Sequence, residues 1–233
     1  MTAQPARRFY RTAAATPEHG VTLDSRTLRT PGGAVFRSPT RALAAAIAAE
    51  WDAQGEHIAP ATMPLTQLGF AALDWTPKSR AELARYITAY AETDLVAHRA
   101  EGPAELVARQ AGAWDPLLAW ARETHGLTLP VVTGVIAAQA DAASIARLAG
   151  FIEAIDDFRL TALAQAAGLA GSAVIALALL TGRLGASEAY QAAALDNLWS
   201  LERWGEDDEA RAKLERQRAE FESLAAFIRH LSA

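Results

Sequence analysis

The chain has 233 residues, of which 51% are hydrophobic, and it carries a formal net charge of −5 with an isoelectric point near 5.6. This apolar content is enough for a sizeable core, so the composition argues against a disordered protein. The basic residues are scattered along an acidic chain, which argues against a nucleic-acid partner, and the absence of cysteine excludes disulfides, thiol nucleophiles and zinc sites with sulfur ligands.

The first forty residues contain short β segments separated by turn signals. The segments FYRTAAA, VTLD, TLRT and AVFRS are divided at Ser25-Arg26 and at Pro31-Gly32-Gly33. Short strands at this spacing are typical of hairpins. We therefore predict a small α+β domain that contains a β-hairpin over residues 1–60.

A helix is predicted directly after these strands, in SPTRALAAAIAAEWDAQG. Ser38 is the expected N-cap, Pro39 the first helical residue and Gly55 the residue beyond the end. We expect Trp51 to pack this helix on its neighbour and the flanking acids, Glu50 and Asp52, to face solvent.

Proline and glycine divide the rest of the chain into further helices. The residue before a proline disfavours helix, so each X-Pro pair marks a boundary. From this pattern we predict an all-helical domain over residues 61–233 and an α+β fold class overall. The helices begin at Pro64, Thr76 and Gly102, with an interruption at Asp115-Pro116; the others cover about 141–156 with a continuation to 167, 171–181, 187–203 and 206–230.

One segment, Leu160 to Gly182, has 23 residues without a charge, which is long enough to span a bilayer. It is rich in alanine and contains Gln165, Ser172 and several glycines, all of which weaken the case for insertion. We predict two buried helices joined near Gly168 to Gly171, and no membrane insertion. The N-terminal segment lacks the apolar stretch of a secretory signal, so we expect a bacterial cytoplasmic protein.

Motifs for nucleotide or metal chemistry are absent from the sequence. There is no GxGxxG, GxxxxGK[ST], GxSxG or HExxH, and the five histidines lack the spacing of a metal site. We therefore predict no cofactor and no metal. In ETDLVAHR, Asp94 and His98 could form an acid/base pair, but a structural role for Asp94, as a helix cap or as a partner of Arg99, is the preferred interpretation.

The stretch LDNLWSLERWGEDDEARA, residues 195–212, mixes tryptophan with carboxylates. If Ser187 caps a helix, Leu195, Leu198 and Leu201 lie near one face, Trp199 belongs to the core, and Asp196 turns mostly away. Gly205 suits the position just past a helix end. The acids at 206–209 suit the first turn of the next helix, where Asp207 with Arg211 and Glu209 with Lys213 have the spacing of ion pairs. Local physics leaves Trp204, between Glu202 and Glu206, without an explanation.

A resemblance to a known family fits this pattern. The strings LDSRTLRTP, AAEWDAQ, PLTQLGFAALD, ETDLVAHRA and YQAAALDNLWSLERWGEDDEA, in that order, resemble the assembly chaperone of the ATP synthase catalytic sector that acts on the α subunit in mitochondria and alphaproteobacteria. The likeness covers about residues 7–222. It implies a small α+β part carried on a helical body.

The resemblance also implies a binding protein without enzymatic activity or cofactor. Such a protein holds the unassembled ATP synthase α subunit and covers its β-facing surface until the catalytic hexamer forms. The partner-binding residues implied here are Asp196, Glu202, Trp204, Gly205 and Glu206. The chain departs from the family at 198–200, where Leu, Trp and Ser stand in place of an acid, a tyrosine and a glutamine.

Two other interpretations remain open from the residues alone. One is an enzyme with an acid/base site between the two domains, formed by Asp94 and His98 or by an acid near Trp204. The other is a helical carrier of a small ligand that uses residues 160–182.

Overall fold

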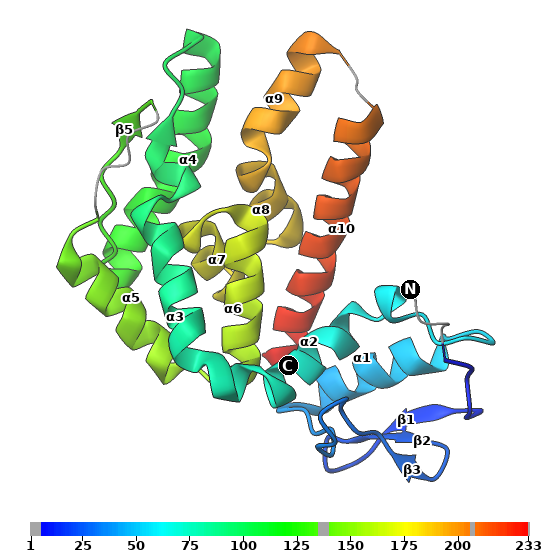
Figure 1. The fold of residues 1–233 in the computed structure, drawn as a ribbon. Coiled ribbons are helices and arrows are strands. Elements are labelled where there is room, and N and C mark those ends of the chain that lie inside the picture. The colour runs from blue at the N-terminus through cyan, green and yellow to red at the C-terminus, as the bar shows by residue number, and fades with distance from the viewer. Residues whose placement is uncertain (1–5, 135–139, 206–207, 233) are drawn as a thin grey trace. The chain divides into compact units, whose positions relative to one another are not determined.

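The computed structural model describes residues 6–134, 140–205 and 208–232, and its fold class is α+β, as predicted (Figure 1). The chain divides into two compact units. The first, here the N-terminal unit, comprises residues 1–79, 156–162 and 226–233. The second, here the helical unit, comprises residues 80–155 and 163–225.

The N-terminal unit contains a three-stranded antiparallel sheet in the order β1 (Ala13–Ala15), β2 (Val21–Leu23), β3 (Arg26–Thr27). Ala14 is opposite Thr22, which is in turn opposite Thr27. Val21 and Leu23 are buried on the face that helix α1 (Arg41–Asp52) covers. The hairpins were therefore predicted correctly, while the fourth segment, AVFRS, contributes only an isolated bridge between Arg29 and Val35.

The start of α1 differs from the prediction by two residues. Thr40, and not Ser38, is the N-cap, and its Oγ1 accepts a hydrogen bond of 3.1 Å from the backbone N–H of Leu43. Thr40 Oγ1 also donates to the carbonyl of His230, at 2.5 Å, near the C-terminus of the chain. Ser38 instead donates to the Thr40 carbonyl, at 2.7 Å. A serine before a proline is a common sign of a helix start. Here Thr40 is the N-cap instead, and it also bonds to the His230 carbonyl, which is distant in the sequence.

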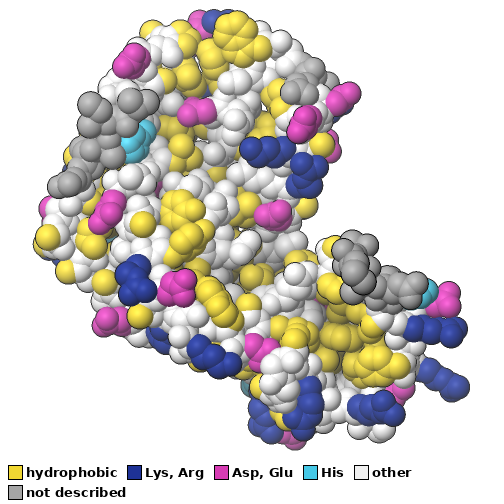
Figure 2. Space-filling view, in the orientation of Figure 1, with side chains coloured by type: hydrophobic (Ala, Val, Ile, Leu, Met, Phe, Trp, Pro, Cys, Tyr) yellow, Lys and Arg dark blue, Asp and Glu magenta, His cyan; other side chains and the backbone are white. Residues whose placement is uncertain are grey.

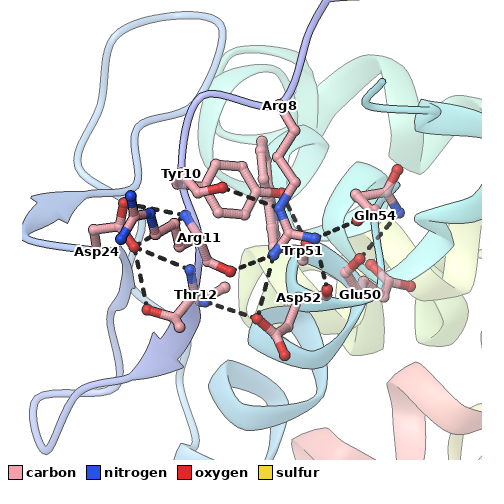
Figure 3. Close-up of polar contacts among 10 residues, drawn as sticks. Arg8, Tyr10, Arg11, Thr12, Asp24, Glu50, Trp51, Asp52 and Gln54 are labelled. Atoms are coloured by element: carbon pink, nitrogen blue, oxygen red, sulfur yellow. Dashed lines mark hydrogen bonds and ion pairs between the residues drawn. The ribbon is translucent and has the colours of Figure 1, made fainter. Parts of the chain in front are cut away.

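Arg8 ties the first described residues to the end of α1 (Figure 3). Its guanidinium donates to the carbonyls of Tyr10, Asp52, Gln54 and Arg11, and its Nη2 lies 3.5 Å from the Asp52 carboxylate. The Tyr10 hydroxyl donates to the Trp51 carbonyl at 2.7 Å. Trp51 is buried, as predicted. Arg8 supplies the hydrogen-bond donors for the backbone carbonyls beside it.

Glu50 does not face solvent, contrary to the prediction. Its carboxylate accepts hydrogen bonds from the backbone N–H groups of Leu65 and Thr66, both at 2.8 Å, and from the Thr66 hydroxyl at 2.7 Å. These are the first residues of α2 (Pro64–Asp74), so Glu50 caps a helix from a distance. Burial raises the pKa of Glu50, and the three hydrogen bonds oppose this shift.

Helices dominate the remainder of the described chain. Two short 3₁₀ segments, η1 (Pro60–Thr62) and η2 (Leu95–Ala97), and a parallel pair of two-residue strands, β4 (His98–Arg99) with β5 (Val132–Thr133), accompany them. The strand pair β4–β5 was not predicted from the sequence. The helices are α3 (Thr76–Glu92), α4 (Ala104–His125), α5 (Ala142–Ala154), α6 (Asp157–Ala170), α7 (Ala173–Leu180), α8 (Ala186–Ala193), α9 (Leu195–Trp204) and α10 (Asp208–Leu231).

Two predicted helix boundaries are wrong. The helix α4 runs through Pro116 without ending, because Trp114, Leu117 and Ala121 bury the turns on both sides of the proline and packing outweighs the lost hydrogen bond. The helix predicted over 187–203 is two helices, α8 and α9, separated at Ala194.

The uncharged segment forms two buried helices, as predicted. Gly171, with φ of +64°, separates α6 from α7, and Ser172 caps α7 by accepting from the N–H of Ile175 at 3.0 Å. Leu160, Leu163 and Ile175 are among the fully buried side chains. Within the described residues, no helix combines the length and apolar character that crossing a bilayer requires.

Candidate partner-binding surface

Two crossed ion pairs connect α9 to α4 within the helical unit. Glu202 on α9 forms a two-point ion pair with Arg109 on α4, with Oε2 at 2.6 Å from Nη1 and Oε1 at 3.0 Å from Nη2. The neighbouring Arg203 reaches Glu105 on α4 at 3.0 Å. The hydrogen bond from Arg109 lowers the pKa of Glu202. Glu202 is therefore an exposed but paired carboxylate, not a free one.

Asp196 is part of a hydrogen-bonded chain and does not turn fully away from the protein. Its Oδ1 accepts from Nε2 of the buried Gln110 on α4 at 2.8 Å, and Gln110 Oε1 accepts from the N–H of Ala100 at 2.9 Å. One turn along α4, Nε1 of the buried Trp114 donates to the carbonyl of Ala192 at 3.0 Å. These contacts hold the end of α8 and the start of α9 against α4.

An open groove of about 460 Å³ lies beside Asp196. Its wall also includes Gln110, His98 and Leu95, and a second hollow of about 490 Å³ shares the last two residues. Charged, polar and apolar groups therefore line the same depression in the helical unit. Such a mixed lining is compatible with a non-obligate protein interface, which as a whole is about as apolar as the rest of a protein surface.

Trp204 ends α9 with 81% of its surface exposed. Gly205 follows with φ of +90° and ψ of 171°, a conformation that strongly favours glycine, although it is not the left-handed helical one. Glu206, the last residue of the predicted site, lies outside the described residues, as does Asp207. An indole this exposed contributes little to folding, so it is available for contact with a partner.

Trp199 is not a core residue, contrary to the prediction. It is half-buried, and the Arg203 guanidinium lies 5.6 Å from its ring centre. In α9 only Leu195 is fully buried, while Leu198 and Leu201 are half-buried. The amphipathic face was predicted, but less of it is buried than expected, and Asp196, Glu202 and Arg203 form polar contacts from α9 to α4.

The sequence did not reveal the α4 half of this surface. Glu105 and Arg109 are four residues apart, a spacing that suggests a pair within one helix. Each of them pairs instead with α9, almost a hundred residues away. The only available signal was this i,i+4 charge pattern, and it indicates an exposed helix face without naming the partner.

Asp94 has a structural role, in agreement with the interpretation preferred from the sequence. Asp94 is buried and accepts from the N–H groups of Val96 and Val174, both at 3.1 Å. The His98 Nδ1 lies 2.9 Å from the Asp94 carbonyl and not from its carboxylate, and Arg99 pairs with Asp115 at 2.5 Å. Nothing here forms an Asp-His acid/base pair. No group of three potential metal ligands occurs among the residues that the structure describes.

Comparisons with known proteins agree with the fold. Residues 7–122 match the ATP12 chaperone protein family. The chain is 24% identical over 223 residues to the mitochondrial protein atp12 of Schizosaccharomyces pombe, covering 89% of this chain and 77% of that protein.

Solved structures are similar over almost the whole chain. Atp12 from Paracoccus denitrificans, solved also as a single-substitution mutant, is 37% identical, with 97% of this chain and 98% of that chain covered and a TM-score of 0.90. A protein from Agrobacterium tumefaciens is 35% identical, with 95% and 84% covered and a TM-score of 0.86. The chain therefore belongs to the ATP12 chaperone family, and it is a chaperone and not an enzyme.

Proposed function

We propose that this chaperone acts in assembly of the ATP synthase, where it binds the unassembled α subunit and shields its β-facing surface until the catalytic hexamer forms. Membership of the ATP12 family supports this role, together with the sequence resemblance that includes the segment around Trp204. An isolated subunit of a ring exposes an interface that invites aggregation, and a chaperone removes that hazard by covering it.

The observation that carries the proposal is the exposure of Trp204 beside paired charges. A large aromatic ring on the surface is costly for solubility and contributes little to this fold, so a partner is the best physical reason for it. Aromatic anchors supply much of the binding energy of protein interfaces, while charges at the rim steer the encounter. We infer that Asp196, Glu202, Trp204, Gly205 and Glu206 border the client-binding surface.

The composition of this surface suits a temporary complex. A wholly apolar interface of large area would be difficult to exchange, whereas hydrated charges around one aromatic anchor allow faster dissociation. The ion pairs of Glu202 and Arg203 with α4 hold the α9 backbone in place, so Trp204 is presented on an ordered helix end. Ordering the anchor in advance reduces the entropy lost on binding.

We further propose that the protein works in the bacterial cytoplasm, where an α subunit would be synthesised and assembled. Similarity to proteins from two bacteria supports this location.

Co-expression with the α subunit tests the proposed function directly. The tagged chaperone should retain the α subunit in a pull-down, and addition of the β subunit should release it as the ring forms. A chaperone that retains the β subunit instead, or that retains α equally well in the presence of β, contradicts the proposal.

A further inference from the structure

A further groove, of about 450 Å³, runs between α3, α6 and α10 in the helical unit, and its lining includes none of the residues 195–205 of α9 and its end. We call it the α6/α10 groove. Figure 2 shows basic side chains beside the half of α10 nearer its N-terminus, and hydrophobic side chains over α3 and α6. Its lining includes Tyr86, Gly168, Leu169, Lys213, Arg216 and Glu220.

Two cations on one helical face are the main electrostatic feature of the α6/α10 groove. Lys213 and Arg216 are three residues apart on α10, so their charges repel each other. Both side chains are exposed, and among the described residues neither has a hydrogen-bond or ion-pair partner, so Lys213 does not form the ion pair with Glu209 that the sequence spacing predicts. Glu220 lies one turn beyond Arg216 but forms no ion pair with it. Most other arginines of the helical unit, such as Arg109 and Arg203, have an acidic partner.

The lining that α3 and α6 contribute is partly apolar and depends on a glycine. A Cβ at Gly168 would lie 2.5 Å from the Tyr86 hydroxyl, so the absence of a side chain lets the Tyr86 ring lie against α6. The Tyr86 hydroxyl is 3.2 Å from that of Tyr90, and this hydrogen bond raises the pKa of Tyr86 to about 12. Leu169 adds an apolar side chain to this lining.

We propose that the α6/α10 groove binds an acidic segment of the client subunit, with its carboxylates against Lys213 and Arg216 and an adjoining apolar side chain on Tyr86 and Leu169. Charge complementarity selects this occupant. A carboxylate relieves the repulsion between the two cations, whereas a basic segment adds to it. The proposal rests on the proposed function, and it gives the chaperone a cationic contact in addition to the acidic and aromatic one around Trp204.

Charge reversal in the groove tests the proposal. The double variant Lys213→Glu with Arg216→Glu should weaken binding of purified α subunit at least tenfold in a titration, and it should flatten the dependence of affinity on salt concentration. The matched control is Arg183→Glu, because Arg183 is also an exposed cation of the helical unit but lies outside the groove. The control should bind within twofold of the parent protein.

The outcomes separate this inference from the proposed function. If the parent protein fails to bind the α subunit, the proposed function is wrong, and the groove proposal, which depends on it, is wrong as well. If the parent binds and the double variant matches it in affinity and salt dependence, only the groove proposal is wrong. Should the double reversal unfold the protein, the neutral pair Lys213→Gln with Arg216→Gln replaces it, with a weaker loss expected and an unchanged affinity contradicting the proposal.

A photo-crosslinking residue at Gln165, which lines the groove, supplies an independent readout. The crosslinked peptide of the α subunit should contain aspartate or glutamate next to an apolar residue. A crosslink to a segment without acidic residues overturns the proposal.

Discussion

Arg109 and Glu202 form a two-point ion pair that joins α4 to α9, with nitrogen-to-oxygen distances of 2.6 and 3.0 Å. The pair places a residue of the proposed client surface in contact with a distant part of the chain. A loss of client binding on mutation of Glu202 therefore has two explanations, direct contact or altered support of α9.

A charge swap distinguishes these explanations. Glu202→Lys should leave the thermal unfolding midpoint nearly unchanged, because the pair is exposed. It should weaken capture of the α subunit, and Arg109→Glu added to it should not restore capture, since the client meets a reversed charge. Full recovery in the swapped double variant would mean that Glu202 acts only by holding α9, and normal capture by the single variant would place the binding surface elsewhere.

Trp204→Ala should reduce capture of the α subunit strongly while changing the free energy of unfolding by only about 0.5 kcal/mol, as for other surface positions. The reason is that 81% of the residue is already exposed in the free protein. Trp75→Ala, which removes another exposed indole from the N-terminal unit, is the matched control and should leave capture intact. Equal capture by both variants would remove Trp204 from the interface.

Asp94 should make the stability of the protein depend on pH. Burial raises the pKa of Asp94 to about 6, and hydrogen bonds from Ser172 and from the backbone of Val174 and Val96 oppose this shift. Because the folded-state pKa lies above the unfolded one, the folded protein binds the extra proton between about pH 4 and 6. Stability from this group therefore falls as pH rises through that window, by an amount on the order of 3 kcal/mol, and then stays constant.

Asp94→Asn should abolish this slope, measured as urea unfolding free energies between pH 4.5 and 7. Asp141→Asn is a control of opposite sign, because the hydrogen bond from Ser144 lowers the pKa of Asp141 and its stabilisation is lost as pH falls. Identical slopes for the parent protein and Asp94→Asn would show that Asp94 keeps an ordinary pKa.

Suppression of α-subunit aggregation should need neither metal nor nucleotide. The sequence lacks phosphate-binding glycine motifs, and the described residues hold no cluster of potential metal ligands. Light scattering of denatured α subunit diluted into the chaperone should show the same protection with EDTA and without ATP. A strict requirement for either would point to a binding site that the sequence motifs do not reveal.

Several local features could be predicted from the sequence because neighbouring residues determine them. Turn residues separate the strands of the hairpins. Asp141 caps α5, Ser172 caps α7, and Gly171 follows the end of α6. In each case the backbone conformation or the cap is settled within about four residues. The division into domains at about residue 60 stays a prediction, since the compact units describe packing and not independent folding.

Long-range contacts decided what the sequence could not. Glu50 was predicted to face solvent, but its carboxylate accepts three hydrogen bonds from the first residues of α2. The N-cap of α1 is Thr40 and not the predicted Ser38, and Thr40 also bonds to the carbonyl of His230. Pro116 stayed inside α4 because burial of its neighbours outweighs one missing hydrogen bond.

The candidate site shows the same division. The sequence by itself determined that an aromatic residue and carboxylates come together at the end of α9, because they are adjacent in the chain. Only the tertiary structure decided that Glu202 and Asp196 are bound by Arg109 and Gln110 while Trp204 remains exposed. The physical reason is that ion pairs and hydrogen bonds form between groups that the fold brings within about 3 Å of each other. The number of residues between two groups in the chain does not determine that distance.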